Sequence, residues 1–335
     1  MKAWQVKAWG EPESLELNEV AVPVVGPGQV LVRVAAAGLN FFDLLQVRGQ
    51  YQIKPPFPFT PGAEVAGVVE AVGAGVTRFA VGNRVMGFSI VGGFGELCVV
   101  PEARCFAVPA GFSMDEAAGF PIVSHTGWYA LERRARLQKG ETLLVQAGAS
   151  GVGMAAIQIG KALGARVIAT AGSEAKREFA RARGADEVLD YSTPAWVETV
   201  KALTGGRGAD VIYDPVGGDV FDESTRCIAF DGRLLIIGFT SGRIPLVNAN
   251  IPLIKGFAIV GVRAGEMRAW SFGFDPSTPG PYNTLAQIRQ AQGDPDGARK
   301  LFAQAAEVKK KLEMAQAKRL GTMGPATRDL PRPAR

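Results

Sequence analysis

The sequence has few of the residues that crosslink a small domain or hold a metal ion. It contains three cysteines and one histidine in 335 residues. Cys98, Cys105 and Cys227 form no spaced motif and cannot all pair, which excludes a disulfide-stapled scaffold and fits a reducing compartment. Long uninterrupted apolar runs are missing, and the first ten residues lack the apolar segment of a signal peptide. We therefore expect a cytoplasmic protein with no membrane association.

A basic patch is missing from most of the chain. The formal net charge is +5, which alone would suit nucleic-acid binding. Residues 264–335 hold 12 of the 37 basic residues but only 7 of the 32 acidic ones, so residues 1–263 carry 25 of each sign. A nucleic-acid site needs its positive charge on the folded body. We predict no nucleic-acid partner and interpret the charged tail as a solvated helical segment.

The composition is that of a soluble globular protein, long enough for two domains. Hydrophobic residues make up 47% and charged residues 21%, which excludes a disordered or collagen-like chain. Up to residue 115, short β-like runs alternate with Gly- and Pro-rich turns, and this pattern predicts a compact, partly open β-barrel. The clearest runs are 30–36, 65–72 and 97–101.

From residue 116 apolar strands alternate with helices. One helix ends at Gly164, the next begins at Ser173 and stops at Gly184, and a third starts near Pro194. Such repeated units form a parallel sheet buried on both faces, and six strands fit a doubly wound Rossmann fold. We predict domains at 1–115 and 116–263 and an atypical, partly helical tail at 264–335. The six strands are expected at 142–147, 166–171, 187–189, 210–213, 233–237 and 258–262.

A glycine-rich segment follows the first of these strands directly and opens a helix. Its Gly151-x-Gly153-x-x-Ala156 pattern matches the dinucleotide fingerprint. The first glycine permits a tight turn, the second lets the backbone approach a pyrophosphate, and the small third residue lets helix and strand pack closely. A generic strand–helix packing turn is the alternative. The predicted cofactor-binding residues of this loop are Ser150, Gly151, Val152 and Gly153.

The end of the second strand favours NADPH over NADH. An NAD enzyme usually has an acidic residue there, and this chain has none before Ser173. Ser173 can donate to a 2′-phosphate, and Lys176 and Arg177 follow within one helical turn. A charge-assisted bond is worth roughly 1.5–3 kcal/mol, about ten- to a hundred-fold in affinity. The alternatives are that Glu174 binds a free 2′-hydroxyl, or that the two cations only form a solvated helix face.

Several further motifs occur together along residues 1–265. They are Gly38-Leu39-Asn40-Phe41-Phe42-Asp43, Pro61-Gly62-Ala63-Glu64-Val65-Ala66-Gly67, Gly82-Asn83-Arg84-Val85, Pro121 with Thr126, and Tyr213-Asp214-Pro215-Val216-Gly217-Gly218. With the glycine loop, this combination resembles the zinc-independent quinone oxidoreductases, the zeta-crystallin-like branch of the medium-chain dehydrogenases/reductases. The resemblance implies a GroES-like β-barrel catalytic domain followed by a Rossmann cofactor domain.

The resemblance also implies that no metal takes part. Zinc-dependent relatives have a cysteine where this chain has Asn40, and a histidine where it has Ala63. Three cysteines are too few for the four-cysteine structural zinc lobe of those relatives. Hydrogen bonds must then polarise the acceptor carbonyl.

Three residues are catalytic candidates through the resemblance. Asn40 can donate its amide N–H to a quinone or ketone oxygen that gains charge. Asp43 can orient that amide or relay protons, and Tyr51 can supply a further donor. Asn and Asp are also typical of turns and helix caps, so a purely structural pair is the alternative.

Other positions of the resembling family contact the cofactor. Thr126 is expected near the nicotinamide, and Tyr191 either near the adenosine phosphate or at the edge of the core. The only histidine, His125, precedes Thr126 and can titrate near a substrate if it is exposed there. Since ligands gather at the ends of parallel strands, residues of the fifth and sixth strand ends are also candidates. These are Gly238, Phe239 and Val262.

The resemblance implies an NADPH-dependent quinone oxidoreductase that reduces a quinone or a conjugated carbonyl in the interdomain cleft. It further implies a homodimer built by extending the cofactor-domain sheet at its sixth strand. An enoyl or alkenal reductase is a close alternative. From Met267 onward the sequence does not resemble the family's return to its first domain, which leaves a non-catalytic, crystallin-like NADPH-binding protein as a second alternative.

Overall fold

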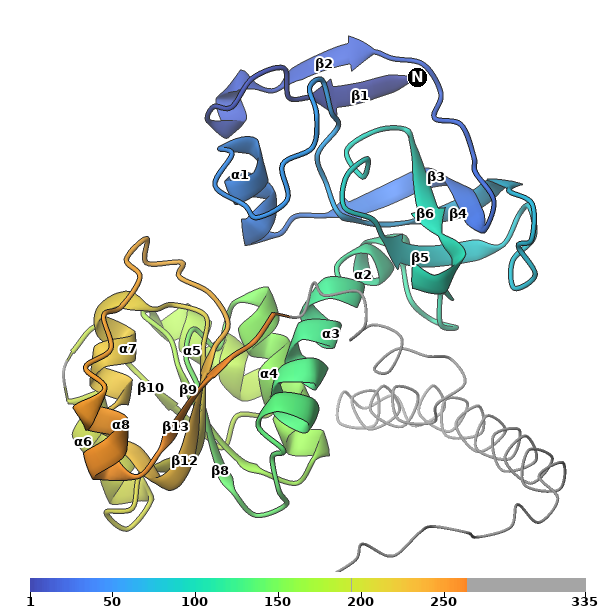
Figure 1. Cartoon of the computed structure of the whole chain (residues 1–335). Helices are drawn as coiled ribbons and strands as arrows, with labels where there is room; N and C mark the ends of the chain where they lie inside the picture. The colour runs from blue at the N-terminus through green and yellow to red at the C-terminus, as the bar shows by residue number, and fades with distance from the viewer. Residues whose placement is uncertain (194, 264–335) are drawn as a thin grey trace, which may run out of the picture. The chain divides into compact units, whose positions relative to one another are not determined.

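The fold is taken from a computed structural model, and the residues that the structure describes are 1–193 and 195–263. The expectations for Pro194 and for the tail at 264–335 lie outside the described residues. The described part contains two main β-sheets, one antiparallel and one parallel, and a separate pair of strands (Figure 1). None of its helices is both long and apolar enough to cross a bilayer.

The first sheet is the β-rich part expected from the short, turn-bounded runs. Its five antiparallel strands lie in the order β6-β3-β4-β5-β7. A separate antiparallel pair, β1 with β2, is joined by a bridge between Ala3 and Gly95 to the segment before β6 (Figure 1). The strands are β1 (Lys2–Gln5), β2 (Glu16–Glu19), β3 (Gln29–Gly38), β4 (Glu64–Val72), β5 (Arg84–Phe88), β6 (Leu97–Pro101) and β7 (Cys105–Ala107). Its core is formed by inward-facing valines and cysteines, namely Val30, Val32, Val65, Val69, Val85, Cys98, Val100 and Cys105.

Short helices connect this sheet to the rest of the chain. Those of the first part are η1 (Pro12–Ser14), α1 (Phe41–Val47) and η2 (Glu102–Arg104). Then follow α2 (Met114–Ala118), α3 (Pro121–Trp128) and a π-helical turn, η3 (Tyr129–Arg134). Helix α3 packs against α4, the helix that follows the glycine loop.

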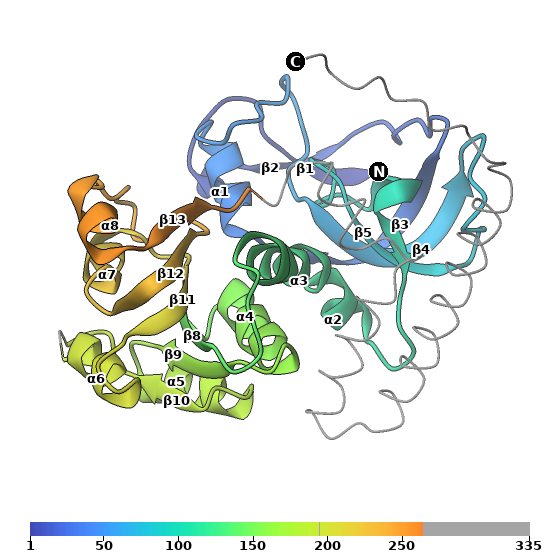
Figure 2. The same cartoon turned by 60° about the horizontal axis from the view of Figure 1, so that its bottom comes forward.

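The second sheet is fully parallel and doubly wound. Its strand order is β10-β9-β8-β11-β12-β13, so the chain starts in the middle and winds first to one edge and then to the other (Figure 2). The strands are β8 (Thr142–Val145), β9 (Arg166–Thr170), β10 (Glu187–Leu189), β11 (Ala209–Asp214), β12 (Ile228–Ile236) and β13 (Ala258–Gly261). The helices are α4 (Gly151–Ala162), α5 (Glu174–Ala182), α6 (Trp196–Leu203), α7 (Gly218–Ser224) and α8 (Asn250–Lys255). The predicted fold class, a β-rich domain followed by a Rossmann sheet, is confirmed.

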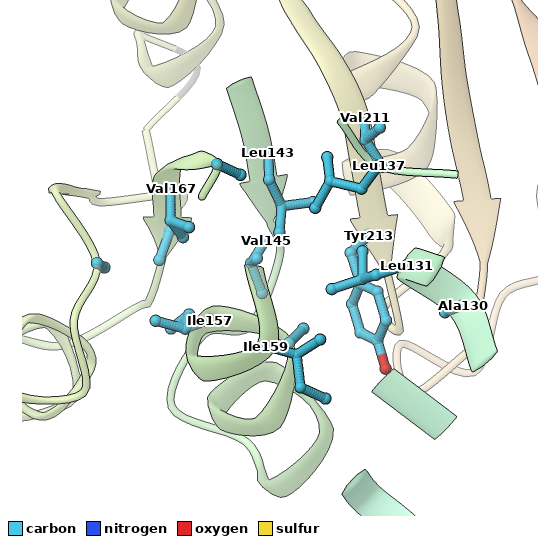
Figure 3. Packing of buried hydrophobic residues seen from close by; sticks show 14 of the residues in the cluster. Ala130, Leu131, Leu137, Leu143, Val145, Ile157, Ile159, Val167, Val211 and Tyr213 are labelled. Atoms are coloured by element: carbon cyan, nitrogen blue, oxygen red, sulfur yellow. The ribbon is translucent and has the colours of Figure 1, made fainter. Parts of the chain in front are cut away.

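Both faces of the parallel sheet are buried because successive side chains of each strand point to opposite sides. On one face, Leu143 and Val145 of β8 pack with residues of α4 and α5. Figure 3 shows Ile157 and Ile159 of α4 in this cluster, with Tyr213 of β11. On the other face, the intervening Leu144 packs with residues of α6 and α7.

The predicted strands agree with the observed ones to within a few residues, except β12. This strand begins at Ile228, five residues before the predicted start. Asp231 has a φ of 59° and Gly232 follows it, so a turn-like pair lies inside a continuous strand. A side chain at position 232 would overlap Ala229 O, which explains the glycine. The short helices α7 and α8 were not predicted, because six or seven residues are too few to show a helical period.

Candidate functional site

The glycine loop forms the tight turn that the fingerprint predicts. Ala147 has a φ of 51°, and Ser150 caps α4: its hydroxyl accepts from Gly153 N at 3.1 Å and donates to Ala147 O at 2.8 Å. A Cβ on Gly153 would overlap Ala147 O. The helix N-terminus therefore presents backbone N–H groups at a turn where a pyrophosphate can approach the main chain.

A buried polar network that no sequence motif signals supports this turn. Thr170 at the end of β9 donates to Gln146 Oε1 at 2.6 Å, and Gln146 Nε2 donates to Ser224 Oγ of α7 at 3.0 Å. The N–H of Ala147 donates to Thr170 Oγ1 at 3.3 Å. All three side chains are buried. Because each is hydrogen-bonded, the network holds the strained Ala147 without leaving a buried polar group unsatisfied.

At the end of β9 the cations differ in what they contact. Arg177 donates to Glu174 at 2.7 Å and to Asp190 at 2.8 Å, so both acidic neighbours are engaged. Ser173 caps α5 and accepts from Lys176 N at 3.4 Å. The Lys176 side chain is exposed, and none of the ion pairs among the described residues involves it. Ser173, the N-cap residue, and Lys176 thus both lie in the first turn of α5.

The remaining cofactor candidates also lie at carboxyl ends of parallel strands. Tyr191 follows β10, and its hydroxyl lies about 3.3 Å from where a Cβ on Gly172 would stand. Gly238 and Phe239 follow β12, and Val262 follows β13 and donates its N–H to Ile236 O at 3.0 Å. With the glycine loop after β8 and Ser173 after β9, the predicted positions thus follow the carboxyl ends of five strands of the parallel sheet.

At the start of α1 the paired Asn40 and Asp43 have separate partners. Asn40 is the N-cap residue, and its backbone N–H donates at 2.8 Å to Oδ2 of Asp43, which reaches back from the first turn of the helix as in a capping box. The Asn40 side-chain Nδ2 donates instead to Glu64 Oε1 at 2.8 Å. The suggestion that Asp43 orients the amide was wrong, because the carboxylate that accepts from it is Glu64. The structural alternative, a helix cap, accounts for the contact of Asp43. It does not account for the side-chain N–H of Asn40, which takes no part in the cap.

Two carboxyl groups of this site are buried and hold their protons more tightly than usual. Burial raises the pKa of Asp43 to about 7, although the Asn40 N–H acts in the opposite direction. Its Oδ1 is buried without a hydrogen-bond partner. Burial likewise raises the pKa of Glu64 to about 7, against the hydrogen bonds from Ile122 and Asn40. The charge of Asp43 raises the pKa of Glu64 slightly further, but burial is the main cause for both groups.

Tyr51 lies close enough to Asp43, and to Arg263 just after β13, for both charges to act on its phenol. Its ring centroid is 5.2 Å from that of Phe42. Burial raises the pKa of Tyr51, the positive charge of Arg263 lowers it, and the charge of Asp43 raises it. The phenol therefore keeps its proton at neutral pH and can act as a donor.

Helix α3 connects this cluster to the glycine loop. The backbone N–H of Ile122 donates to Glu64 Oε2 at 2.9 Å. The next residue, Val123, lies against Gly151, since a Cβ there would be 3.2 Å from Val123 Cγ1. Thr126 lies on the same helix. His125 is fully buried, and burial lowers its pKa to about 3, so it is neutral and not the titrating group that the sequence left open.

The ionisation of Asp43 makes stability depend on pH. Its pKa is raised from 3.8 to about 7 on folding, so this group's contribution is fully present below pH 4 and is lost as pH rises through 7. Asp43→Asn keeps an oxygen for the Asn40 N–H and removes the charge. We expect the variant to gain about 2–4 kcal/mol over the wild type in urea unfolding at pH 8.

At pH 5 the gain should fall to less than half of that value, because folded wild-type Asp43 is then protonated and only the unfolded chain ionises. Asp115→Asn, at an exposed position of α2, serves as the control. An equal gain at both pH values would contradict a buried, titrating Asp43.

Sequence comparisons show what the chain resembles. Residues 26–110 match the alcohol dehydrogenase GroES-like domain, and residues 151–272 match the zinc-binding dehydrogenase domain. The chain is 40% identical over 261 residues to the quinone oxidoreductase-like protein 2 of Rattus norvegicus, covering 78% of this chain and 75% of that protein. It is also 40% identical to a quinone oxidoreductase of Pseudomonas aeruginosa over 256 residues, covering 76% and 78%.

A solved structure shows the same fold. The NADPH complex of Escherichia coli quinone oxidoreductase aligns with a TM-score of 0.77 at 27% identity, covering 91% of this chain and 97% of that one. The zinc-binding wording is part of the name of the second domain's family, and the two positions where a cysteine and a histidine occur in zinc-dependent relatives are Asn40 and Ala63 in this chain. Within residues 1–193 and 195–263, no three His, Cys, Asp or Glu side chains come together in a way that could hold a metal ion.

Proposed function

Because the chain belongs to the quinone oxidoreductase branch of the medium-chain dehydrogenases/reductases, we propose that it reduces a quinone or a conjugated carbonyl with NADPH. The observation that carries the proposal is the Asn40 amide. Glu64 holds one of its N–H groups, and the second can donate to an acceptor oxygen. The same Glu64 contacts α3, which lies against the glycine loop.

In this proposal the ends of the parallel strands bind NADPH. The loop Ser150–Gly153 receives the pyrophosphate at the N-terminus of α4, where Gly151 and Val152 offer their backbone N–H groups. Those of Ser150 and Gly153 donate to Ala147 O and Ser150 Oγ and hold the turn. Ser173 and Lys176 bind the 2′-phosphate, with Tyr191 beside them. The cofactor supplies a hydride, and its nicotinamide end lies with Thr126, Gly238, Phe239 and Val262.

The catalytic candidates act on the acceptor. When a quinone receives the hydride on one oxygen or carbon, the opposite oxygen gains negative charge, and the Asn40 N–H stabilises that charge. A proton must then reach the acceptor to complete the hydroquinone. Asp43, whose pKa burial raises to about 7, is the proton source in this proposal, and the Tyr51 phenol is a further donor. We place this chemistry in a cleft between the two domains, with no metal ion.

The direct test is oxidation of NADPH and NADH by the purified, chelator-treated protein with a simple para-quinone. Faster oxidation of NADPH is expected. Reduction of an enone but not of the quinone would favour an enoyl or alkenal reductase. NADPH binding without oxidation of either acceptor would favour a non-catalytic binding protein and overturn the proposal. Activity that disappears with chelator and returns with zinc would overturn the metal-free mechanism.

The preference for NADPH can be tested at Lys176. Lys176→Ala removes a cation that has no ion pair among the described residues, so its loss should act on the ligand and not on the fold. We expect NADPH affinity to fall about ten- to a hundred-fold, with NADH affinity unchanged. Lys139→Ala, which removes an exposed lysine just before β8 at the opposite end of the strand, is the control. Equal losses for both cofactors would contradict a 2′-phosphate site.

We also propose a cytoplasmic homodimer. The three cysteines are unpaired and buried, which suits a reducing compartment. Strand β13 is the last strand of its sheet, with no neighbour among the described residues on its outer side. Exposed apolar side chains occur on the segments around it in the sequence, and such an edge favours pairing with a second copy. The most exposed are Phe230, Leu246, Leu253 and Ile254, at 77%, 88%, 82% and 74%.

The dimer predicts a change of mass in one variant and not in another. Leu246→Asp should convert a sedimenting dimer into a monomer, since a charge would be buried in an apolar interface. Val24→Asp is the matched control. Val24 is 90% exposed, but it precedes β3, a strand of the antiparallel sheet. A wild-type monomer, or a Leu246→Asp dimer, would contradict the proposed interface.

A further inference from the structure

We infer that Glu64 is a positioning residue for the reduction: it fixes which way the Asn40 amide faces and holds that amide against helix α3. The inference rests on the proposed function. It assigns a role to a side chain that would contact neither the acceptor nor the cofactor. Its support is the arrangement of Gly38, Asn40 and Ile122 around one carboxylate.

The antiparallel sheet is built to accommodate a carboxylate at this point. Glu64 is the first residue of β4, and it lies opposite Gly38 of β3 and Phe88 of β5. Its exposed fraction is 1%. A Cβ on Gly38 would overlap Glu64 Oε1, so only glycine leaves room for the side chain to reach Asn40. Burying a carboxyl group is costly unless its oxygens are hydrogen-bonded, and both of these are.

An ionised carboxylate fixes the amide orientation. It offers only acceptors, so the nitrogen and not the oxygen of the Asn40 amide must face it. The bond from Nδ2 to Glu64 Oε1 is 2.8 Å. The planar amide then has one N–H engaged and one directed elsewhere, which is the geometry a carbonyl acceptor needs. A neutral amide in place of Glu64 would allow Asn40 to turn over and present its oxygen.

The second oxygen of Glu64 connects the amide to the cofactor side. Oε2 accepts the N–H of Ile122, the second residue of α3, at 2.9 Å. The residue before the helix, Phe120, provides no side-chain cap, so Glu64 serves as the acceptor for this helix N-terminus. Helix α3 carries Thr126 and places Val123 against Gly151. A single carboxylate therefore fixes the position of the Asn40 amide relative to helix α3, which contacts the glycine loop.

Glu64→Gln tests the inference, because it keeps the size of the side chain, removes the charge and replaces one acceptor oxygen with an N–H donor. The introduced amide can satisfy Ile122 with its oxygen and then offers an N–H to Asn40, which favours the turned asparagine. We expect kcat at pH 8, where wild-type Glu64 is mostly ionised, to fall about 10- to 100-fold, less than the roughly 100- to 1000-fold for removing one donor to a developing oxyanion outright. NADPH affinity should change less than about threefold, since no cofactor contact is removed. Glu70→Gln, on the same strand but paired with Arg33 on the surface, is the matched control.

Combination with Asn40→Ala separates positioning from mere stabilisation. If Glu64 acts through Asn40, Glu64→Gln has no further effect on kcat in the Asn40→Ala background. Multiplying effects, or an unchanged kcat in the single variant, would overturn the inference while leaving the proposed function intact. Should Glu64→Gln unfold, Glu64→Asp keeps the charge but shortens the side chain, and the same loss of kcat and the same non-additivity are expected.

A binding measurement keeps the inference separate from the redox proposal. Affinity of the NADP⁺ complex for 1,4-benzoquinone should fall in Glu64→Gln and in Asn40→Ala to the same level. If the wild type oxidises no NADPH but shows this pattern of binding, the proposed function fails and the positioning role stands. Equal quinone binding by the wild type and both variants would overturn the positioning role.

Discussion

Replacing Asn40 with alanine is expected to lower kcat about 100- to 1000-fold, which is the effect of removing one donor from a developing oxyanion. The amide N–H is directed by Glu64 and is not used in the helix cap. The cap from Asp43 survives, because that carboxylate accepts from the backbone N–H of residue 40, which alanine retains. Cofactor binding involves other residues, so the Kd for NADPH should stay within about threefold of the wild type. Steady-state kinetics with a para-quinone and fluorescence titration with NADPH measure the two quantities.

The variant leaves Glu64 Oε1 without its donor, so a loss of stability of about 1–3 kcal/mol is expected beside the loss of rate. Asn18→Ala, which removes an amide from β2, is the control for a general effect of such substitutions. A variant that keeps the wild-type kcat would exclude Asn40 from the mechanism. A variant that loses NADPH binding as well would show that the asparagine has a structural role in the cofactor domain.

The order of elements could be predicted because local signals were strong. The parallel strands are short apolar runs bounded by glycines, and the loop from Ala147 to Gly153 contains the dinucleotide fingerprint. Strand β12 contains the turn-like residues Asp231 and Gly232, and for that reason its first half was not predicted as strand. Short helices without two full turns gave no periodicity to read.

The partners of the site residues depend on register, which one sequence does not reveal. Glu64 and Asn40 are 24 residues apart and meet because β3 and β4 pair with Gly38 opposite Glu64. Gln146 and Thr170 are also 24 residues apart and meet across two parallel strands. The spacing of Asn40 and Asp43 suited a cap and a catalytic pair equally. Only the direction of each side chain shows that the Asn40 amide N–H faces Glu64 and not Asp43.

Gly153→Ala is expected to lower NADPH affinity more than Lys176→Ala does. The Cβ would overlap Ala147 O, a backbone atom that cannot rotate away. Ala147 is already held at positive φ by its bonds with Ser150 and Thr170, so the turn must open to relieve the overlap. Opening the turn displaces the N–H groups at the start of α4. Since these groups bind the pyrophosphate in the proposed function, NADPH affinity should fall at least about 100-fold, as for the loss of two hydrogen bonds to a charged group.

Two glycine variants calibrate this result. Gly119→Ala places its Cβ 3.7 Å from Asp115 O, an ordinary contact, and should leave NADPH affinity unchanged. Gly151→Ala meets only the side-chain end of Val123 at 3.2 Å, so its fold should be less disturbed than that of Gly153→Ala. Thermal unfolding without cofactor measures the effect on the turn, and NADPH titration measures the effect on binding. If Gly153→Ala binds NADPH as the wild type does, the pyrophosphate does not lie on this loop, because this substitution cannot leave the N–H groups in place.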